Sequence, residues 1–363
     1  MQKEDKMPFT QALGETILNY RYSYSVARAR GMRRHLLTDK QLATIIDSRD
    51  IEGSLDILNS TSYGPVLAET STRGFQEMEQ ALNKDLITTL QKVHKFLPKK
   101  VNEIFYWYLV KYEAINLKTI LRGVFAKVPK DETIKNLLPI SLTIKMSVYE
   151  DLASLPNIEE IVSQSDSTIF GPALTKALPE YEKSGLILPL ETALDRFVYE
   201  NLWKKASEFK GMDVKFLKKA IGIEIDILNL KVLVRTKTED IKPEEVSKYL
   251  IPKGFVLNSK KLASLNKLEE VDAVVNAMEN TAYSKPLEDG IEKYKKTGEL
   301  SSVERALDSY YSSLAFELQQ NQPQGMGPIW RYIIDKTTEI RNIILILKLK
   351  MENFTPEEIK SLV

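Results

Sequence analysis

Three carboxylates, each followed three positions later by an asparagine, are the residues whose types and spacing could do chemistry. The pairs stand 113 residues apart: Glu113 with Asn116, Asp226 with Asn229, and Glu339 with Asn342. Three convergent carboxylates would form a metal cage, and three amides would offer ligands at a threefold centre. The alternative is structural: a core amide that bridges backbone groups of neighbouring helices, and an acid that is solvated or salt-bridged. We favour the structural interpretation, because the asparagines lie in otherwise apolar segments.

The composition excludes most other chemistry. The chain has 363 residues, and 51 basic residues against 50 acidic ones give a net charge of +1, which argues against a protein made basic for nucleic acid. It has no cysteine and two histidines, His35 and His94, which leaves almost nothing for a thiol or transition-metal site. The phosphate-binding patterns Gly-x-x-x-x-Gly-Lys-Ser/Thr and Gly-x-Gly-x-x-Gly do not occur. We therefore expect no catalytic, cofactor or metal site.

One segment concentrates basic and aromatic residues near the N-terminus. Its members are Arg21, Arg28, Arg30, Arg33, Arg34 and His35, together with Tyr20, Tyr22 and Tyr24. The alternatives are a nucleic-acid reader, a solvated helix face and a protein-docking surface; arginine and tyrosine are favoured at interface centres. No basic stripe elsewhere matches this segment, so we expect no nucleic acid. The candidate docking residues are Arg28, Arg30, Arg33, Arg34, Arg122 and Arg235.

The spacing of 113 residues extends far beyond the acid–asparagine pairs. Residues 116–122 recur at 229–235 and 342–348, and a Thr-x-Tyr/Phe block at 61–67 recurs at 168–174 and, with an insertion, at 281–287. Residues 28–32 form a fourth, divergent copy of the asparagine-bearing segment. We predict three repeat units over residues 16–122, 123–235 and 236–353, with 354–363 repeating a Pro-Glu-Glu helix start.

The elements that carry these residues are predicted to be helices. Glycine and proline number 15 each, fewer than a turn-rich β-protein needs. Residues 223–230 alternate like a strand, but their copies follow a helical period, so we assign all three to helices. The Pro-Glu-Glu segments are typical of helix starts. No apolar run approaches the length of a membrane span, and no signal peptide follows the charged N-terminus. We predict an all-α protein that is cytoplasmic, or peripheral to a membrane through another protein.

The triplicated helical pattern, with residues 24–30 near the N-terminus and the Glu-x-x-Asn-Leu segments, resembles the C subunit of the archaeal A-type ATP synthase and its eukaryotic relative, the d subunit of the V-type ATPase. The resemblance covers essentially the whole chain. It implies three similar helical domains around a pseudo-threefold axis, forming a funnel. The implied role is to join the central rotor shaft, of the D and F type, to the membrane proteolipid ring and to transmit torque, at the cytoplasmic face of the membrane and without catalytic residues.

Two other functions remain open at this stage. One is an all-helical interaction scaffold outside the rotary ATPases, although the repeats of helical solenoids are usually about 20–50 residues long, well short of 113. The other is an all-α enzyme with a site in a central cavity, which requires clustered side chains that face inward.

Overall fold

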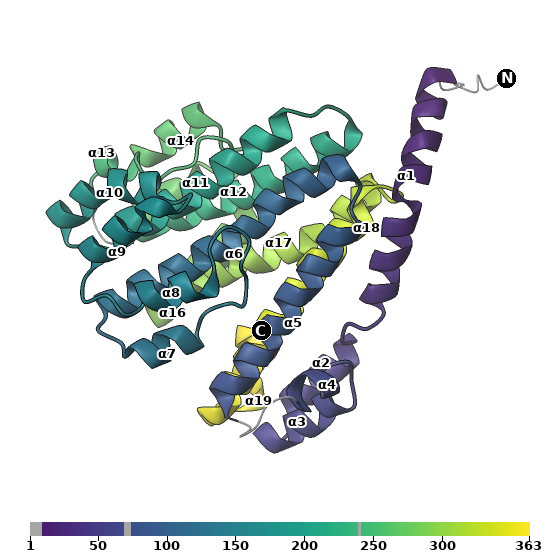
Figure 1. Ribbon diagram of the computed structural model, residues 1–363, viewed down its shortest axis with the longest axis horizontal. Helices are drawn as coiled ribbons and strands as arrows, with labels where there is room; N and C mark the ends of the chain where they lie inside the picture. The colour runs from purple at the N-terminus through teal and green to yellow at the C-terminus, as the bar shows by residue number, and fades with distance from the viewer. Residues whose placement is uncertain (1–8, 69–73, 239–240) are drawn as a thin grey trace.

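The chain folds into helices joined by short connections, as the computed structural model shows for residues 9–68, 74–238 and 241–363 (Figure 1). The described residues include no β-strand, only an isolated bridge between Lys253 and Asn258, so the predicted all-α class is confirmed. Among them, no helix combines the length and apolar composition that a membrane span requires.

The helices recur in one order along the chain. Four are long: α1 Phe9–Arg33, α6 Lys99–Phe125, α12 Met212–Thr238 and α18 Met326–Met351. A second set precedes the last three of these: α5 Phe75–Phe96, α11 Leu188–Ser207 and α17 Ser301–Asn321. A third set precedes the second: α4 Gly64–Ala68, α10 Gly171–Ser184 and α16 Ser284–Thr297. Apart from α1, each of these sets therefore supplies one helix to each of the three predicted units.

Short helices complete each copy. One set is α2 Asp39–Asp47, α8 Met146–Leu152 and α14 Ser259–Asn266. The next is α3 Ile51–Asn59, α9 Ile158–Gln164 and α15 Val271–Asn276, with a short 3-10 turn, Ser165–Ser167, after α9. The last is α7 Lys130–Lys135, α13 Pro243–Val246 and α19 Pro356–Leu362, which begin with the sequence Lys-Asp-Glu in α7 and Pro-Glu-Glu in the other two. The division into three units about an axis, and the funnel shape, stay predictions.

The helix boundaries follow from local chemistry. Thr38 begins α2 and Thr355 begins α19, each through a reciprocal capping pair with the residue three positions on, Gln41 or Glu358. In the Thr-x-Tyr/Phe block, the threonine hydroxyl accepts the backbone N–H two residues later, 3.2 Å away in all three copies. These side chains hold the turns that lead into α4, α10 and α16.

The strand-like alternation at residues 223–230 has a simple cause, because this part of α12 is buried on almost every side. Ile223, Ile225 and Ile227 are buried, and so are the polar Asp226 and Asn229 between and after them. A helix buried all round has no polar face to give a period of 3.6. The prediction of a helix here is confirmed.

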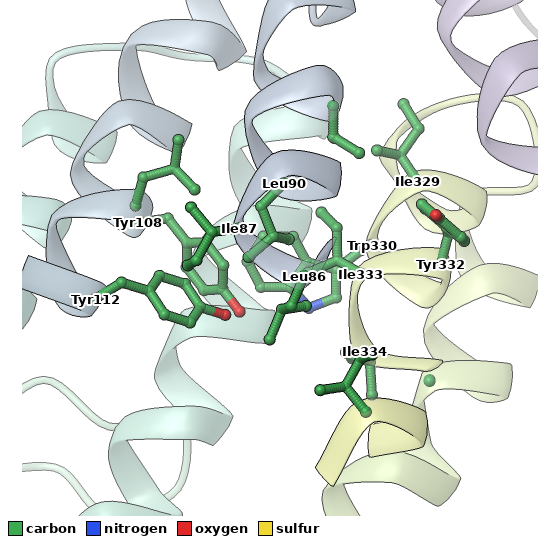
Figure 2. Close-up of a cluster of buried hydrophobic side chains, with 14 of the residues drawn as sticks. Leu86, Ile87, Leu90, Tyr108, Tyr112, Ile329, Trp330, Tyr332, Ile333 and Ile334 are labelled. Carbon is green, nitrogen blue, oxygen red and sulfur yellow. The ribbon is translucent and has the colours of Figure 1, made fainter. Parts of the chain in front are cut away.

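The first halves of α6 and α12 meet α5 and α18 in one large hydrophobic cluster. Figure 2 shows Leu86 and Leu90 of α5 beside Trp330 and Ile333 of α18, and the ring of Tyr108 lies 4.9 Å from that of Trp330. The second half of α6 enters a cluster with α8–α11, and that of α12 enters one with α14–α17. The long helices therefore tie two outer cores to a central one.

Helix α1 lies along the edge of the molecule and packs on α18 and α5 (Figure 1). Its buried residues include Tyr22, Val26 and Ala29. The Tyr22 hydroxyl donates to Asp213 of α12, 3.0 Å away. Helix α1 is thereby fixed against α18 and α12.

Trp330→Ala should lower the free energy of unfolding by about 3–5 kcal/mol, because it empties a large, fully buried volume at the centre of the protein. Met351→Ala, on the same helix at a position 49% exposed, should change it by no more than about 0.5 kcal/mol. Urea unfolding of both variants measures this, and equal losses would contradict the central packing role.

Candidate functional site

Two of the three repeat asparagines each form two hydrogen bonds with the backbone of a single residue, one with its N–H and one with its C=O. We call this arrangement a bracket. The side-chain Oδ1 of Asn116 accepts the N–H of Leu138 at 2.7 Å, and its Nδ2 donates to the carbonyl of the same residue at 2.9 Å. Asn229 does the same with Ile251, at 2.8 Å for both bonds. Both asparagines are buried. The structure thus places them as amides that fix the segment after α7 and after α13.

Asn342, the third member, is different. It is half-buried on α18 and lines a cleft, and within the described ranges no backbone group forms the bracketing pair with its side chain. The sequence offers no hint of this, because all three asparagines stand in equivalent apolar surroundings.

Among the described residues, Glu113 and Asp226 are buried and form no ion pair, so the expectation of a solvated or salt-bridged acid is wrong for these two, whereas Glu339 is half-buried. Glu113 is fully buried, and its Oε1 accepts the N–H groups of Leu142, Thr143 and Ile144 at 2.6–3.1 Å. Consecutive N–H groups that converge in this way form a cradle for an anion. The acid lies one helical turn before the asparagine and on the same face, so both side chains point at the same backbone segment.

Asp226 repeats this arrangement with small changes. It is fully buried and accepts the N–H groups of Val256 and Leu257, at 2.7 and 3.0 Å, and the hydroxyl of Tyr283 at 2.9 Å. A Cβ at Gly254 would lie 1.8 Å from Asp226 Oδ1, so only glycine lets the backbone pass this close.

Glu339 of α18 binds the N-terminal part of the chain instead of a segment that follows it. It accepts the N–H of Leu37 at 2.6 Å and the hydroxyl of Tyr63 at 2.5 Å. Tyr63 and Tyr283 occupy matching places in the Thr-x-Tyr/Phe block. The third carboxylate therefore joins α18 to segments that lie about 300 and 280 residues earlier in the chain.

A ladder of ion pairs links α6 to α11 and α12 to α17. Lys118 pairs with Asp195 at 2.7 Å, and Lys231 with Asp308 at 2.8 Å. The candidate docking residues Arg122 and Arg235 continue the ladder: Arg122 pairs with Glu191, and Arg235 with Glu304 at 3.4 Å. The Arg122 side chain is still 62% exposed, so the ion pair leaves most of it accessible.

A partly buried ion pair lies where three of the long helices, α6, α12 and α18, meet. Lys111 of α6 is 2.9 Å from Glu224 of α12, and the Tyr199 hydroxyl donates to the same carboxylate oxygen at 2.7 Å. Burial lowers the pKa of Lys111, but Glu224 outweighs it and the pKa is raised. A cavity of about 180 Å³ adjoins the pair, lined also by Thr337 of α18.

Sequence reasoning missed this central pair, although a signal was present. Lys111, Glu224 and Thr337 stand 113 residues apart. A comparison of the copies position by position would have found a cation, an anion and a neutral residue at one repeat position. When equivalent positions of two repeated helices lie next to each other, opposite charges at these positions can pair, whereas like charges would repel.

The arginines of the basic segment near the N-terminus have different partners within the chain. Arg28 donates to Tyr24 at 2.8 Å and lies over the ring of Phe96, and Arg33 pairs with Asp335 of α18 at 2.8 Å. Arg30 donates to the carbonyl of Pro323 at 2.9 Å, while Arg34 lines the cleft beside Asn342. The side chain of Tyr20 lies outside the described residues.

These side chains hold backbone and helices rather than a reacting centre. In the part of the chain that the structure describes, no three acidic or histidine side chains gather as metal ligands. The acids of the three repeats each bind a different backbone segment, so the carboxylate cage considered from the sequence does not form among them.

Comparison with known proteins identifies the architecture. Residues 25–362 match the family described as ATP synthase (C/AC39) subunit. The chain belongs to this family. The family match begins inside α1 and ends inside α19, so it covers all three acid–asparagine pairs.

Curated relatives agree over nearly the full length. The A-type ATP synthase C subunit of Methanocaldococcus jannaschii is 30% identical over 343 residues, which cover 94% of this chain and 86% of the relative. That of Methanobrevibacter smithii is 30% identical, with 92% and 85% covered. That of Pyrococcus horikoshii is 27% identical, with 96% and 92% covered. The resemblance seen in the sequence is thus confirmed.

Asn229→Leu should lower the free energy of unfolding by about 1–3 kcal/mol for each backbone group of Ile251 left unpaired. Asn342→Leu is the matched control at the equivalent position, and it should cost no more than about 0.5 kcal/mol because no such bracket is lost. Urea unfolding of the two variants measures the difference. Equal effects would show that the bracket does not stabilise the fold.

Burial raises the pKa of Asp226 more than its backbone N–H donors lower it. The folded protein therefore holds this proton more tightly than the unfolded chain does. The contribution of this proton to the free energy of unfolding is complete below the pKa that Asp226 has in the unfolded chain. It is lost as the pH rises through the pKa of Asp226 in the folded protein. We expect the difference in unfolding free energy between the parent and Asp226→Asn to shrink from pH 4 to pH 7. Asp151→Asn, at an exposed acid, is the control, and an unchanged difference for Asp226→Asn would contradict the assignment.

Proposed function

We propose that this chain is a non-catalytic subunit of the central stalk of a rotary A-type ATP synthase. In this role it links the soluble rotor shaft, of the D and F type, to the membrane proteolipid ring, and it transmits torque for ion-coupled ATP synthesis or hydrolysis. The observation that carries the proposal is the family match over residues 25–362. Relatives named as the C subunit of the A-type ATP synthase, matched over more than nine-tenths of this chain, support it.

The packing of the helices suits a mechanical coupler. Torque must pass through elements that deform little under load, and close-packed interiors are poorly compressible. The central cluster joins α1, α5, α6, α12 and α18, and the ladder of ion pairs and the backbone brackets tie the outer helices to them.

The proposed location follows from the proposed partners. The chain would lie at the cytoplasmic face of the membrane, as a peripheral protein held there by the proteolipid ring and not by a helix of its own. The six candidate docking arginines would contribute to the contacts with shaft or ring. Three of them, Arg33, Arg122 and Arg235, already form ion pairs within the chain, and the side chain of Arg122 is the most exposed of the three.

Tagged protein incubated with detergent-solubilised membranes should recover the shaft subunits and the proteolipid, identified by mass spectrometry. Recovery of neither would overturn the proposal. Purified protein alone should hydrolyse no ATP, and turnover that follows the protein through purification would overturn its non-catalytic part.

A ring whose copy number differs from three favours polar, adaptable contacts over one keyed apolar patch. We therefore expect recovery of the proteolipid to fall as salt rises, because exposed charge pairs are screened. Recovery is measured at several salt concentrations in one detergent. Capture that survives high salt but disappears with a mild detergent would contradict a polar interface.

A further inference from the structure

A cleft of about 700 Å³ lies between the end of α1 and helix α18. Arg30, Arg34 and Leu37 line it on one side, and Glu339 and Asn342 line it on the other. The cleft thus contains the third acid–asparagine pair, at the place where the end of the chain meets its beginning.

In the other two copies, an irregular segment of the chain itself is hydrogen-bonded to the asparagine. This segment follows α7 or α13, and its residues Leu138 and Ile251 are bracketed by Asn116 and Asn229. Among the described residues, no backbone N–H and C=O form the corresponding pair of hydrogen bonds with Asn342, which lines the cleft.

The bracketed residues share a sequence context. Leu138 and Ile251 are both aliphatic, and both stand directly before a proline, Pro139 or Pro252. A residue before proline is restricted to extended conformations, which presents its N–H and C=O together on one edge. An asparagine side chain can then bind both groups of a single residue.

The cleft is lined by four arginines and by Asp39, Asp335 and Glu339, and two of the arginines form no ion pair among the described residues. Asp335 is shared by Arg33 and Arg331, at 2.8 and 3.4 Å. Within the described part of the chain, Arg34 forms no ion pair with a carboxylate, and Arg30 donates to a backbone carbonyl. The cleft therefore suits a peptide that carries a carboxylate near its bound backbone.

We propose that this cleft binds an extended segment of a partner protein: an aliphatic residue followed by proline, with an acidic side chain nearby. Asn342 brackets the aliphatic residue, as Asn116 and Asn229 bracket their own, and Arg30 and Arg34 bind the acidic group. The binding completes the third copy of an interaction that the chain forms internally twice. The inference does not depend on the rotary function proposed above.

The probe is a fluorescein-labelled peptide with the sequence of residues 136–141 and a glutamate added at each end. Its binding to the full chain is followed by fluorescence anisotropy at low salt. We expect saturable binding, weakened about tenfold by Asn342→Leu, because two hydrogen bonds are lost. A peptide methylated at the backbone nitrogen of the leucine before proline should bind the parent protein more weakly than the unmethylated peptide does. The two peptides should bind Asn342→Leu with nearly equal affinity.

Charge recognition is tested with Arg34→Gln and a peptide in which glutamine replaces glutamate. Arg34→Gln should weaken the binding of the glutamate peptide and leave the binding of the glutamine peptide unchanged. Arg21→Gln, at an exposed position of α1 outside the cleft, is the matched control and should bind like the parent. Thermal unfolding checks that each variant is folded.

Three results would overturn the proposal. They are an absence of binding to the parent, equal binding by Asn342→Leu, and insensitivity to methylation combined with displacement by inorganic phosphate. The last result would identify the cleft as a simple anion site.

Discussion

The structure depends on polar side chains of the long helices that hold the backbone of the irregular segments between helices. Such segments carry N–H and C=O groups that no helix satisfies, and buried groups of this kind need partners. One helical turn of α6 supplies an acid and an amide, Glu113 and Asn116, that together satisfy four backbone N–H groups and one carbonyl. The short helices that follow are thereby fixed relative to the long one, and α12 repeats the device.

The closing contacts bring together residues about 300 positions apart. Besides Glu339, α18 uses Asp335 to bind Arg33, and Lys350 to donate to the carbonyl of Ile46 at 3.0 Å. Helix α19 adds an ion pair between Lys360 and Asp47, 2.6 Å apart. Helix α18, which belongs to the central core, is thus joined directly to the N-terminal part of the chain, and α19 is joined to α2. This property fits the proposed transmission of torque.

The copies have diverged where their environments differ. Phe170 stands where Tyr63 and Tyr283 donate to their carboxylates, and the Thr143 hydroxyl supplies the missing donor to Glu113 at 2.6 Å. Such compensation keeps a buried acid fully bonded, since an unpaired buried charge is costly. The central pair of Lys111 and Glu224 requires divergence, because identical charges could not meet there. A partner would therefore encounter three related but unequal surfaces.

The sequence by itself determined the helical class, the repeat spacing and the family resemblance, since these follow from local propensity and from the register of short motifs. It also indicated correctly that the strand-like stretch in α12 is helical, because the copies share one backbone. It could not determine what Asp226 or Asn342 touches. The acids' partners lie about 30 residues away for Asp226 and at the other end of the chain for Glu339, and no local pattern encodes such contacts. Only the tertiary structure decided that Glu113 and Asp226 are buried against backbone N–H groups, and that one of three equivalent asparagines faces a cleft.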